Sequence, residues 1–488
     1  MQAGLCVYEN SILMNITMIL EMAASAGDRA VITAGGRSLT AAELLHRAHA
    51  AAHRFRGHQA VVYLGPNQLA YPVALFGAAL AGVPFVPVNY RLGEQQLNAL
   101  LARHSGAVVL RPADLDALLD ERPDVEFLDP PQDQDSVAVL LYTSGTTAEP
   151  KAAVLRHRHL LAYVLNTQEF ASAEEDDASL VAVPPYHVAG LMNLLTNLYS
   201  GRRIVYLQAF EPRQWLETVR GERITHALVV PTMLARIVAE VPGDDAGTPL
   251  LRSLAYGGAR TPGPLVERAL RIFPQTGFVN AYGLTETASS LTVLGPDDHW
   301  QASVSHDPAV RDRLGSVGRA LPGIEIQIRT DDDKPAPAGE TGLVFVRGEQ
   351  ISGEYGGRSA LDAAGWFATR DRGRLDAEGY LFIEGRADDT IIRGGENIAP
   401  AEIEDVLLAH PGIVEAAVVG LPDPEWGQRI VAIVVGAGDP AEIRQWVKDR
   451  LRSSKTPDAI VFRAELPKTE TGKLLRRTLL AELETTHA

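Results

Sequence analysis

The most informative stretch of the chain is residues 137–151, Val137-Ala138-Val139-Leu140-Leu141-Tyr142-Thr143-Ser144-Gly145-Thr146-Thr147-Ala148-Glu149-Pro150-Lys151. Its apolar beginning predicts a strand, and the hydroxyl-rich remainder predicts a loop that follows the strand. Backbone N–H groups freed by a glycine, several hydroxyls and one ammonium group form a cradle suited to a polyphosphate. Gly145 does not fit the Gly-x-x-x-x-Gly-Lys-[Ser/Thr] spacing of a Walker A loop. The stretch indicates nucleotide chemistry of another kind, although such a composition alone is more often a surface turn.

Short apolar runs alternate with helical patterns through most of the first 330 residues. The alternation predicts parallel sheets that are covered by helices on both faces. The strand-like runs are residues 60–64, 107–110, 178–183, 203–207 and 227–230, and a helix is predicted over 69–81. From residue 323 the pattern changes, because 324–328 alternates strictly between apolar and polar residues. Together with 342–346, this run predicts a small antiparallel or barrel-like subdomain.

A second boundary is predicted at residues 385–389. Beyond it, the pattern predicts helices at 402–407 and 441–451 and strands at 415–419 and 430–435, which is a module of ordinary domain size. The predicted fold class is therefore α/β with two domains. Residues 1–387 hold the parallel sheets, flanked by helices, and the small β-barrel-like subdomain, and residues 388–488 form the C-terminal domain.

Composition restricts the classes of partner. The formal net charge of −16 argues against a nucleic-acid partner and against a polybasic membrane surface. The single cysteine, Cys6, excludes a disulfide framework and fits a cytoplasmic setting. The apolar run at residues 11–20 is interrupted by Asn15 and has no preceding Lys or Arg, so we expect a first helix and not a signal peptide. No run reaches the length of a membrane span.

Five further motifs place glycine, hydroxyl or charged residues between the predicted elements. They are residues 257–259 (Gly-Gly-Ala), 280–286 (Asn-Ala-Tyr-Gly-Leu-Thr-Glu), 366–371 (Trp-Phe-Ala-Thr-Arg-Asp), 385–400 (Gly-Arg-Ala-Asp-Asp-Thr-Ile-Ile-Arg-Gly-Gly-Glu-Asn-Ile-Ala-Pro) and 466–473 (Leu-Pro-Lys-Thr-Glu-Thr-Gly-Lys). Each has an ordinary explanation when it is taken alone. Thr285 could cap a helix with Glu286 near the positive end of its dipole, for example, and Asp371 could be a solvated turn residue.

Taken together and in this order, the six motifs resemble those of the adenylate-forming superfamily, which comprises acyl- and aryl-CoA ligases, peptide-synthetase adenylation domains and beetle luciferases. The resemblance is strongest to CoA ligases of the chlorobenzoate-CoA and fatty-acyl-CoA type. Two positions depart from the usual pattern, because Ala148 and Arg370 stand where relatives carry glycine. The resemblance implies an enzyme that uses ATP and Mg²⁺ to convert a carboxylate to an acyl-adenylate with release of pyrophosphate, and then transfers the acyl group to a thiol.

The resemblance also assigns roles to residues of this chain. It implies that Lys473 bridges the substrate carboxylate and the α-phosphate, and that Asp388 is the hinge of a mobile C-terminal domain. Glu286 and Thr146 would hold the metal ion, and Arg386 would act on the ribose or phosphate side of the nucleotide. The remaining ATP-binding residues implied are Thr143, Ser144, Gly145, Thr147, Lys151, Gly257, Gly258, Ala259, Asn280, Tyr282, Gly283, Thr285 and Asp371.

For the thiol, the resemblance implies coenzyme A. Arg91 matches a position that meets the CoA phosphates, and Trp426 matches one that stacks on the CoA adenine. Residues 453–458 depart from the pattern, because relatives carry an aromatic residue and several basic residues there, and this chain keeps only Lys455 and adds Asp458. The phosphopantetheinyl arm of an acyl carrier protein therefore stays open as the alternative acceptor.

For the acid, the resemblance implies that His187 gates the acyl site and that the other lining residues are Val188, Gly257, Ala281 and Ala288. These residues are small or apolar, and the Asp that peptide synthetases use for an α-amino group is missing. We therefore expect an uncharged aryl or medium-length acyl carboxylate. A luciferase-like monooxygenase and a catalytically inactive nucleotide-binding module are the competing classes. The sequence does not decide between a monomer and a homodimer.

Overall fold

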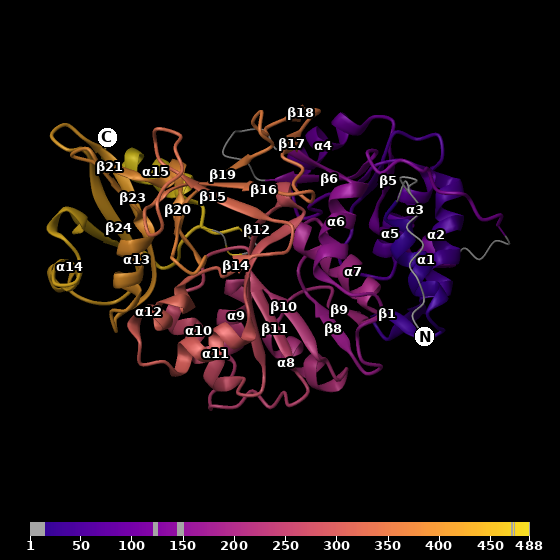
Figure 1. Ribbon diagram of the computed structural model, residues 1–488, viewed down its shortest axis with the longest axis horizontal. Coiled ribbons are helices and arrows are strands. Elements are labelled where there is room, and N and C mark those ends of the chain that lie inside the picture. Colours follow the sequence, from indigo (N-terminus) through magenta and orange to yellow (C-terminus); the bar gives the residue numbers. More distant parts are fainter. Residues whose placement is uncertain (1–14, 121–124, 144–150, 470–471, 473, 488) are drawn as a thin grey trace. The chain divides into compact units, whose positions relative to one another are not determined.

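The computed structural model describes residues 15–120, 125–143, 151–469, 472 and 474–487 (Figure 1). The chain divides into two compact units. Unit 1 comprises Met1–Ala209, Thr285–Ser289 and Glu349–Ala360, and unit 2 comprises Phe210–Leu284, Ser290–Gly348 and Leu361–Ala488. None of the described helices is both long enough and apolar enough to cross a membrane.

Unit 1 contains two groups of strands. In the first, parallel strands continue into an antiparallel edge, in the order β5 (Val108–Leu110), β3 (Val61–Tyr63), β4 (Phe85–Pro87), β6 (Val137–Thr143), β7 (Lys151–Arg156), β17 (Glu354–Tyr355) and β18 (Arg358–Ser359). In the second, parallel strands β8 (Ala178–Val181), β9 (Arg203–Tyr206) and β1 (Ala30–Ala34) are followed by antiparallel β2 (Arg37–Thr40). The carboxyl ends of β6 and β8 lead into the loops that carry the predicted phosphate and acyl residues.

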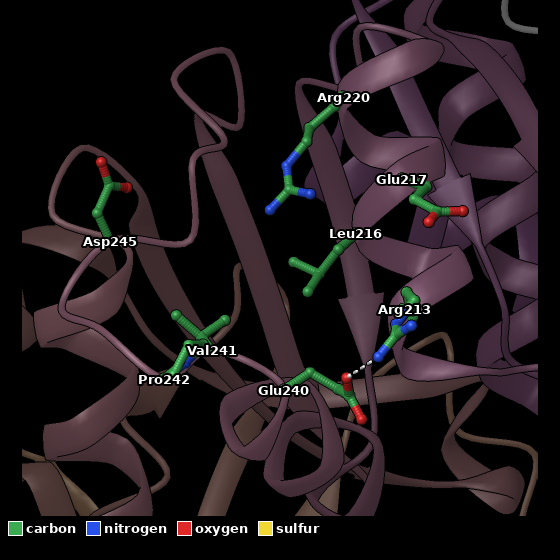
Figure 2. A pocket seen from close by; sticks show the side chains of 8 residues that line it. All are labelled: Arg213, Leu216, Glu217, Arg220, Glu240, Val241, Pro242 and Asp245. Atoms are coloured by element: carbon green, nitrogen blue, oxygen red, sulfur yellow. Dashed lines mark ion pairs between the residues drawn. The ribbon is translucent and has the colours of Figure 1, made fainter.

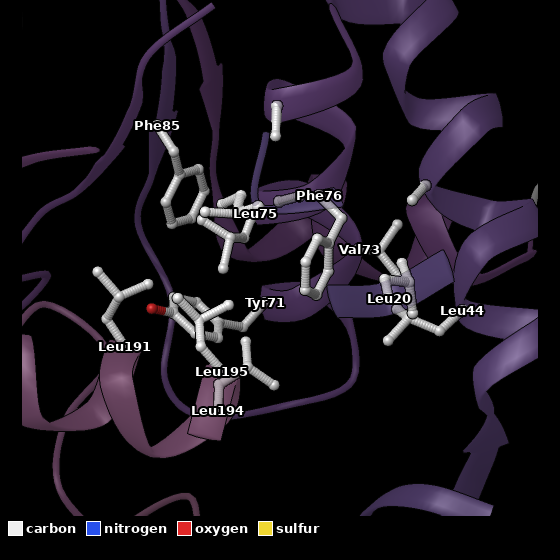
Figure 3. Packing of buried hydrophobic residues seen from close by; sticks show 14 of the residues in the cluster. Leu20, Leu44, Tyr71, Val73, Leu75, Phe76, Phe85, Leu191, Leu194 and Leu195 are labelled. Carbon is white, nitrogen blue, oxygen red and sulfur yellow. The ribbon is translucent and has the colours of Figure 1, made fainter. Parts of the chain in front are cut away.

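The core of unit 1 is built by apolar faces of its helices. Tyr71 and Phe76 of α3 (Ala70–Ala81) are buried with Leu20 of α1 (Thr17–Ser25) and Leu194 of α7 (Val188–Ser200), as Figure 3 shows. The next helix in the packing, α2 (Ala41–Phe55), begins at a capping box in which Thr40 and Glu43 bond each other's backbone N–H groups. The surrounding helices are α4 (Glu94–Leu101), α5 (Pro112–Asp120) and α6 (His157–Thr167).

Unit 2 begins with three parallel strands, β10 (His226–Val229), β11 (Ser253–Gly257) and β12 (Gly277–Leu284), which Figure 1 labels together with their helices. Those helices are α8 (Pro212–Gly221), α9 (Pro231–Ala239), α10 (Gly263–Ile272), α11 (Pro296–Val304) and α12 (Pro308–Arg311). An antiparallel pair, β13 (Ser289–Leu294) and β14 (Arg319–Ala320), follows. The next sheet is antiparallel throughout, in the order β15 (Glu325–Arg329), β16 (Gly342–Arg347), β19 (Phe367–Leu375) and β20 (Leu381–Arg386).

The C-terminal residues of unit 2 have sheets and a hydrophobic core of their own. The hairpin of β23 (Ile413–Asp423) and β24 (Gly427–Gly436) pairs in parallel with β25 (Ala459–Phe462), and β21 (Ile391–Arg393) pairs with β22 (Glu396–Ile398). Three helices pack on them, α13 (Pro400–Leu408), α14 (Pro440–Lys448) and α15 (Arg476–His487).

The predicted α/β fold class is confirmed. The first helix, predicted in the run at residues 11–20, spans Thr17–Ser25, with residues 11–14 outside the described ones, and the other predicted strands and helices have counterparts within a few residues. The sequence analysis did not predict the antiparallel edge strands β7 and β17, which are the ones that reach the site. The separation of a domain of residues 1–387 from one of residues 388–488 stays a prediction.

Candidate active site

The predicted phosphate loop leaves β6 and returns as β7. These two strands pair antiparallel, and Thr143 lies opposite Lys151, so the structure fixes both ends of the loop. Lys151 is exposed at the first position of β7. Ser144, Gly145, Thr146, Thr147 and Ala148 lie outside the described residues, and their roles stay predictions.

Glu286 lies in a single 3₁₀ turn, Thr285–Thr287, next to a segment that the sequence analysis missed. The Tyr355 hydroxyl donates a hydrogen bond to Glu286 Oε1. The backbone N–H groups of Ser352 and Gly353 donate to the Glu286 carbonyl oxygen at 2.9 and 3.2 Å. Gln350 Nε2 donates to the Thr287 carbonyl at 2.9 Å. Residues 350–355 therefore hold both the backbone and the carboxylate of the predicted metal ligand.

The same segment is tied to β7. Tyr355 pairs with Ala153 in the sheet, and the Ser352 hydroxyl donates to the Val154 carbonyl. The guanidinium of Arg156 donates to both carboxylate oxygens of Glu354 at 2.9–3.0 Å. Such two-point pairs are geometrically restrictive. No short sequence motif could have revealed these contacts, because the partners are separated by 69 to 198 residues.

His187 and Val188 stand at the start of α7, where both are partly exposed. The ring of His187 lies 4.8 Å from that of the buried Tyr186. The Tyr186 ring in turn packs edge-to-face on Tyr90 at 6.0 Å, and the Arg91 guanidinium carbon lies 5.5 Å from the Tyr90 ring. In unit 1, the loop that carries His187, the predicted acyl gate, therefore contacts the loop that carries Arg91, the predicted CoA-binding arginine.

Ala288 differs from the other predicted acyl residues. It is completely buried in the core of unit 1, so its side chain is not part of an accessible surface in this structure. The backbone there is strained, with φ values of 51° at Ala288 and 109° at Ser289. Non-glycine residues in this region are uncommon and cluster at functional sites.

In unit 2 the predicted adenine segment follows β11. Gly257 lies opposite Ala281 of β12, and a Cβ on Gly257 would fall 2.1 Å from the Ala281 carbonyl oxygen. Glycine is therefore required there by strand packing, before any ligand is considered. Gly258 has φ of 82°, and a Cβ there would meet nothing closer than 3.9 Å. The side-chain amide of Asn280, within β12, donates to the Ser316 carbonyl at 3.1 Å.

Asp371, Tyr282 and Arg386 are brought together in unit 2. The Tyr282 hydroxyl donates to Asp371 Oδ2 at 2.6 Å, and Arg386 Nε lies 3.2 Å from Asp371 Oδ1. Asp371 and Arg386 are cross-strand partners on β19 and β20. Burial, followed by the Asp371 carboxylate, raises the pKa of Tyr282, so its phenol stays protonated and remains a donor. The carboxylate is thus held by a hydrogen bond at one oxygen and by an ion pair at the other.

A bulge in the pairing of β16 with β19 orients Asp371. The pairing of β16 with β19 shifts register between Leu343 and Phe345, where the Thr369 hydroxyl donates to the Val344 carbonyl at 2.9 Å. Arg370, within the bulge, has φ of 63°, which is a left-handed conformation. Bulges are frequent beside active sites because they redirect a side chain. The structure therefore explains the glycine of relatives at this position, since only glycine adopts this φ without strain.

The C-terminal residues hold the predicted hinge and CoA residues. Asp388 is exposed in a 3₁₀ turn, Ala387–Asp389. Trp426 is 48% exposed at the turn between β23 and β24, and its carbonyl accepts from the Gly394 N–H at 2.8 Å. Lys473 lies outside the described residues. Among the described residues around it, Lys468 and Leu474 form an antiparallel bridge.

The unexpected acidic residue of the CoA segment has partners of its own. Asp458 Oδ1 accepts from Arg393 at 2.9 Å, and Oδ2 accepts from the Ile430 N–H at 2.8 Å. Lys455 forms an ion pair with Glu402. The charge of Asp458 is therefore neutralised inside the C-terminal part.

Unit 2 also has a surface hollow, which none of the predicted site residues lines. Its walls are α8 and the residues that follow α9, and Figure 2 shows the ion pair across it, Arg213 to Glu240 at 3.7 Å. Both wall segments precede the amino ends of parallel strands, whereas Gly257 and Tyr282 lie toward the carboxyl ends. Ligands of parallel sheets bind at the carboxyl ends, so the hollow is not assigned to the active site.

Comparison with known proteins identifies the family. The description "AMP-binding enzyme" matches residues 20–355, and "AMP-binding enzyme C-terminal domain" matches residues 402–473. The chain belongs to the AMP-binding enzyme family. This confirms the resemblance to the adenylate-forming superfamily that the six motifs indicated.

The chain is similar to several CoA ligases of this family. It is 36% identical to a feruloyl-CoA synthase of Amycolatopsis sp over 476 residues, which cover 91% of this chain and 93% of that one. It is 34% identical to an indoleacetate–CoA ligase of Aromatoleum aromaticum, with 88% of each chain covered. It is 31% identical to a fatty acid–[acyl-carrier-protein] ligase of Streptomyces coeruleorubidus, with 91% of each covered.

Among solved structures, the fold matches the o-succinylbenzoate CoA synthetase of Bacillus subtilis in complex with its acyl-adenylate. The TM-score is 0.82 at 28% identity, and 94% of this chain and 97% of that chain are covered. The same synthetase in complex with ATP and magnesium gives a TM-score of 0.79. This AMP-binding family member is an AMP-forming acyl- or aryl-CoA synthetase that uses ATP, Mg²⁺ and CoA, and the carrier-protein alternative is not favoured.

Proposed function

We propose that this synthetase acts on a carboxylate whose aryl or medium-length acyl group carries no further charge. We also propose that the residues described above have the roles that the resemblance implies. The observation that carries the choice of acid is the chemistry of the acyl residues His187, Val188, Gly257 and Ala281. None of them is Lys or Arg, so a second carboxylate or a sulfonate would have no counter-ion among them. Burying an unpaired charge is strongly unfavourable. The aromatic acids in the names of two relatives agree with this choice.

For ATP, we assign the ribose to Asp371 and the adenine to the turn after β11. A hydrogen bond from Tyr282 and an ion pair with Arg386 orient the Asp371 carboxylate, and carboxylate oxygens are the acceptors that ribose hydroxyls require. The open space above Gly258 suits a flat ring. Glu286 supplies the hard carboxylate oxygens that Mg²⁺ prefers, and the metal neutralises phosphate charge when it is bound.

The first step needs no side-chain nucleophile. The substrate carboxylate attacks the α-phosphorus of ATP, the P–O bond to the β-phosphate breaks, and pyrophosphate leaves. The protein contributes position and charge neutralisation. We assign the cation at the attacking carboxylate to Lys473. In the second step the CoA thiolate attacks the acyl carbon and AMP leaves.

For CoA, we assign the adenine to Trp426 and the phosphates to Arg91. The exposed face of Trp426 is available for stacking. Asp458 does not oppose this assignment, because Arg393 and the Ile430 N–H already engage its two oxygens. Arg91 is carried on a loop that packs against Tyr186, so the thiol would enter beside the acyl gate.

The test is acid-dependent pyrophosphate release across a carboxylate panel, with thioester formation measured on free CoA and on a carrier protein. We expect kcat/KM for uncharged aryl and medium-chain acids to exceed that for dicarboxylates and amino acids by about a hundredfold, since leaving one charge buried and unpaired costs about 3 kcal/mol or more. Activity confined to short dicarboxylates or amino acids would contradict the assignment of the acid. Thioester formation on the carrier protein alone would contradict CoA as the acceptor.

A further inference from the structure

The Tyr355 phenol is the side chain that the structure places on the carboxylate of Glu286. We propose that Tyr355 is a positioning residue for Mg²⁺·ATP: it holds one oxygen of Glu286 and leaves the other directed at the metal. The inference rests on the proposed metal role of Glu286. It goes beyond that role, because Tyr355 belongs to none of the six motifs and lies 69 residues away in sequence.

The backbone of Glu286 is already fixed. Its carbonyl oxygen accepts from two consecutive N–H groups, those of Ser352 at 2.9 Å and Gly353 at 3.2 Å. The next residue is held by Gln350 through the Thr287 carbonyl. With the backbone held, the remaining freedom of Glu286 lies in its side-chain torsions. Ordering a Glu side chain costs conformational entropy and so opposes binding, and a contact that orders it in advance therefore favours the metal complex.

The phenol supplies this order because Tyr355 is itself rigidly placed. Its strand pairs with Ala153, and the preceding residue, Glu354, is gripped at two points by Arg156. Ser352 adds a third tie, to the carbonyl of Val154. All these partners belong to β7, the strand that begins where the phosphate loop ends. The segment 350–355 thus connects the carboxylate of Glu286 to the base of the phosphate loop within unit 1.

The chemistry of the contact favours one geometry of metal binding. The hydrogen bond is made to Oε1, so that oxygen has one lone pair less for a cation. The residues that the structure describes make no hydrogen bond to Oε2, so Oε2 is the oxygen that would coordinate Mg²⁺. Partners that orient a metal-binding carboxylate typically contribute ten- to a hundredfold to metal affinity. A residue with a purely structural role would instead change nucleotide affinity whether or not the metal is present.

One experiment distinguishes a metal-positioning role of Tyr355 from a purely structural role. Calorimetric titration of the full-length protein with α,β-methylene-ATP, once with excess Mg²⁺ and once with EDTA, gives the metal-dependent enhancement of binding. For Tyr355→Phe we expect this enhancement to fall about tenfold, while the affinity measured in EDTA stays at the wild-type value. The matched control is Tyr380→Phe, which removes a phenol that donates to the Asp298 carboxylate at 2.6 Å in unit 2, and it should change neither value.

Glu286→Gln distinguishes failure of this inference from failure of the proposed function. If Glu286→Gln abolishes the enhancement and Tyr355→Phe leaves it unchanged, Glu286 binds the metal and Tyr355 does not position it, which overturns the inference alone. If Glu286→Gln retains the full enhancement, the metal assignment fails and the inference fails with it. Equal losses with Mg²⁺ and with EDTA for Tyr355→Phe would also overturn it, since they indicate a structural role.

Discussion

Arg370 has a strained backbone conformation that is imposed by the bulge beside it. The bulge that aims Asp371 forces its neighbour to φ of 63°, and this chain places an arginine there. An L-residue in the left-handed region is less stable by about 1–2 kcal/mol, whereas glycine adopts this region freely. The protein therefore retains local strain beside the proposed ribose-binding carboxylate.

Arg370→Gly should stabilise the protein. Relief of about 1–2 kcal/mol of strain, less the roughly 0.5–1 kcal/mol that the added freedom of glycine removes, leaves a gain of up to about 1.5 kcal/mol. Urea unfolding measures it. The control is Arg372→Gly on the same strand, where φ is not positive and the side chain pairs with Asp331 at 3.0 Å, and this variant should be destabilised. A destabilised Arg370→Gly would show that the arginine side chain contributes more than the strain removes.

Residues of the site differ in how far the sequence predicted them. Asp371 and Glu286 stand in short motifs whose order is informative, so their types and positions could be read directly. Tyr355 and Arg156 could not, because their contacts join segments far apart in the chain. Gly257 was predicted for a different reason from the one observed: the carbonyl of Ala281 excludes any side chain there.

At the scale of elements, the start of α6 is built on two buried histidines. His157 Nδ1 accepts from the Ile16 N–H at 3.3 Å and so ties α6 to the residue before α1. His159 Nδ1 accepts from the Arg156 N–H at 3.2 Å. Burial lowers the pKa of each to about 4. Both contacts require an unprotonated nitrogen, so both depend on the neutral imidazole.

We predict that these histidines make the protein sensitive to acid. Because the pKa of His157 is near 6.5 in the unfolded chain and about 4 when folded, the unfolded state binds more protons as the pH falls through this window. The free energy of unfolding should therefore decrease between about pH 6.5 and 4, by up to roughly 3 kcal/mol for this residue. Unfolding midpoints in urea measured across this range test the prediction.

The comparison variants are His157→Asn and His58→Asn. The first keeps an acceptor near the Ile16 N–H but does not titrate, so its midpoint should change less between pH 6.5 and 4 than that of the wild type. His58 is exposed, and its replacement should leave the wild-type pH dependence intact. Parallel curves for His157→Asn and the wild type would mean that other groups cause the acid sensitivity.

Elements were predictable where local pattern determines them. The parallel strands β3 and β5 are continuous apolar runs, and β8 is apolar except for Ser179; all three are bounded by helices and lie where they were expected. The two-residue strand β17 has no such pattern. It is stabilised by its pairing with β7 and by the hydrogen bonds from Arg156 to Glu354. Tertiary contacts, and not local propensity, form this strand.

At the scale of the whole molecule, Arg476 connects the parts that the resemblance expects to move together. Its guanidinium donates to both oxygens of Glu404 on α13, at 2.6 and 2.9 Å, and to the Val418 carbonyl on β23 at 2.8 Å. Its Nε lies 3.4 Å from Asp389, beside the proposed hinge. Arg476 comes three residues after Lys473 in the sequence, so these contacts fix the chain shortly after the lysine.

Arg476→Gln should therefore act on the first half-reaction. Removing the guanidinium leaves the buried Glu404 carboxylate without its cationic partner and frees the chain that follows Lys473, so we expect acid-dependent pyrophosphate release to fall at least about tenfold. Thioester formation from supplied acyl-adenylate, for which we propose no role of Lys473, should change by less than about twofold. Lys473→Ala is the reference for this pattern, and Arg477→Gln, an exposed neighbour, should leave both half-reactions unchanged.

The ratio of the two half-reaction rates distinguishes a positioning role of Arg476 from general destabilisation of the C-terminal part, because destabilisation would lower both rates together. Rescue supplies a second criterion. Arg476→Lys keeps a cation beside Glu404 and Asp389 but cannot donate at two points, so pyrophosphate release should recover only in part. If Arg476→Gln slows both half-reactions equally, Arg476 supports folding and does not position Lys473. If Lys473→Ala itself retains pyrophosphate release, the lysine assigned to the first step is the wrong one.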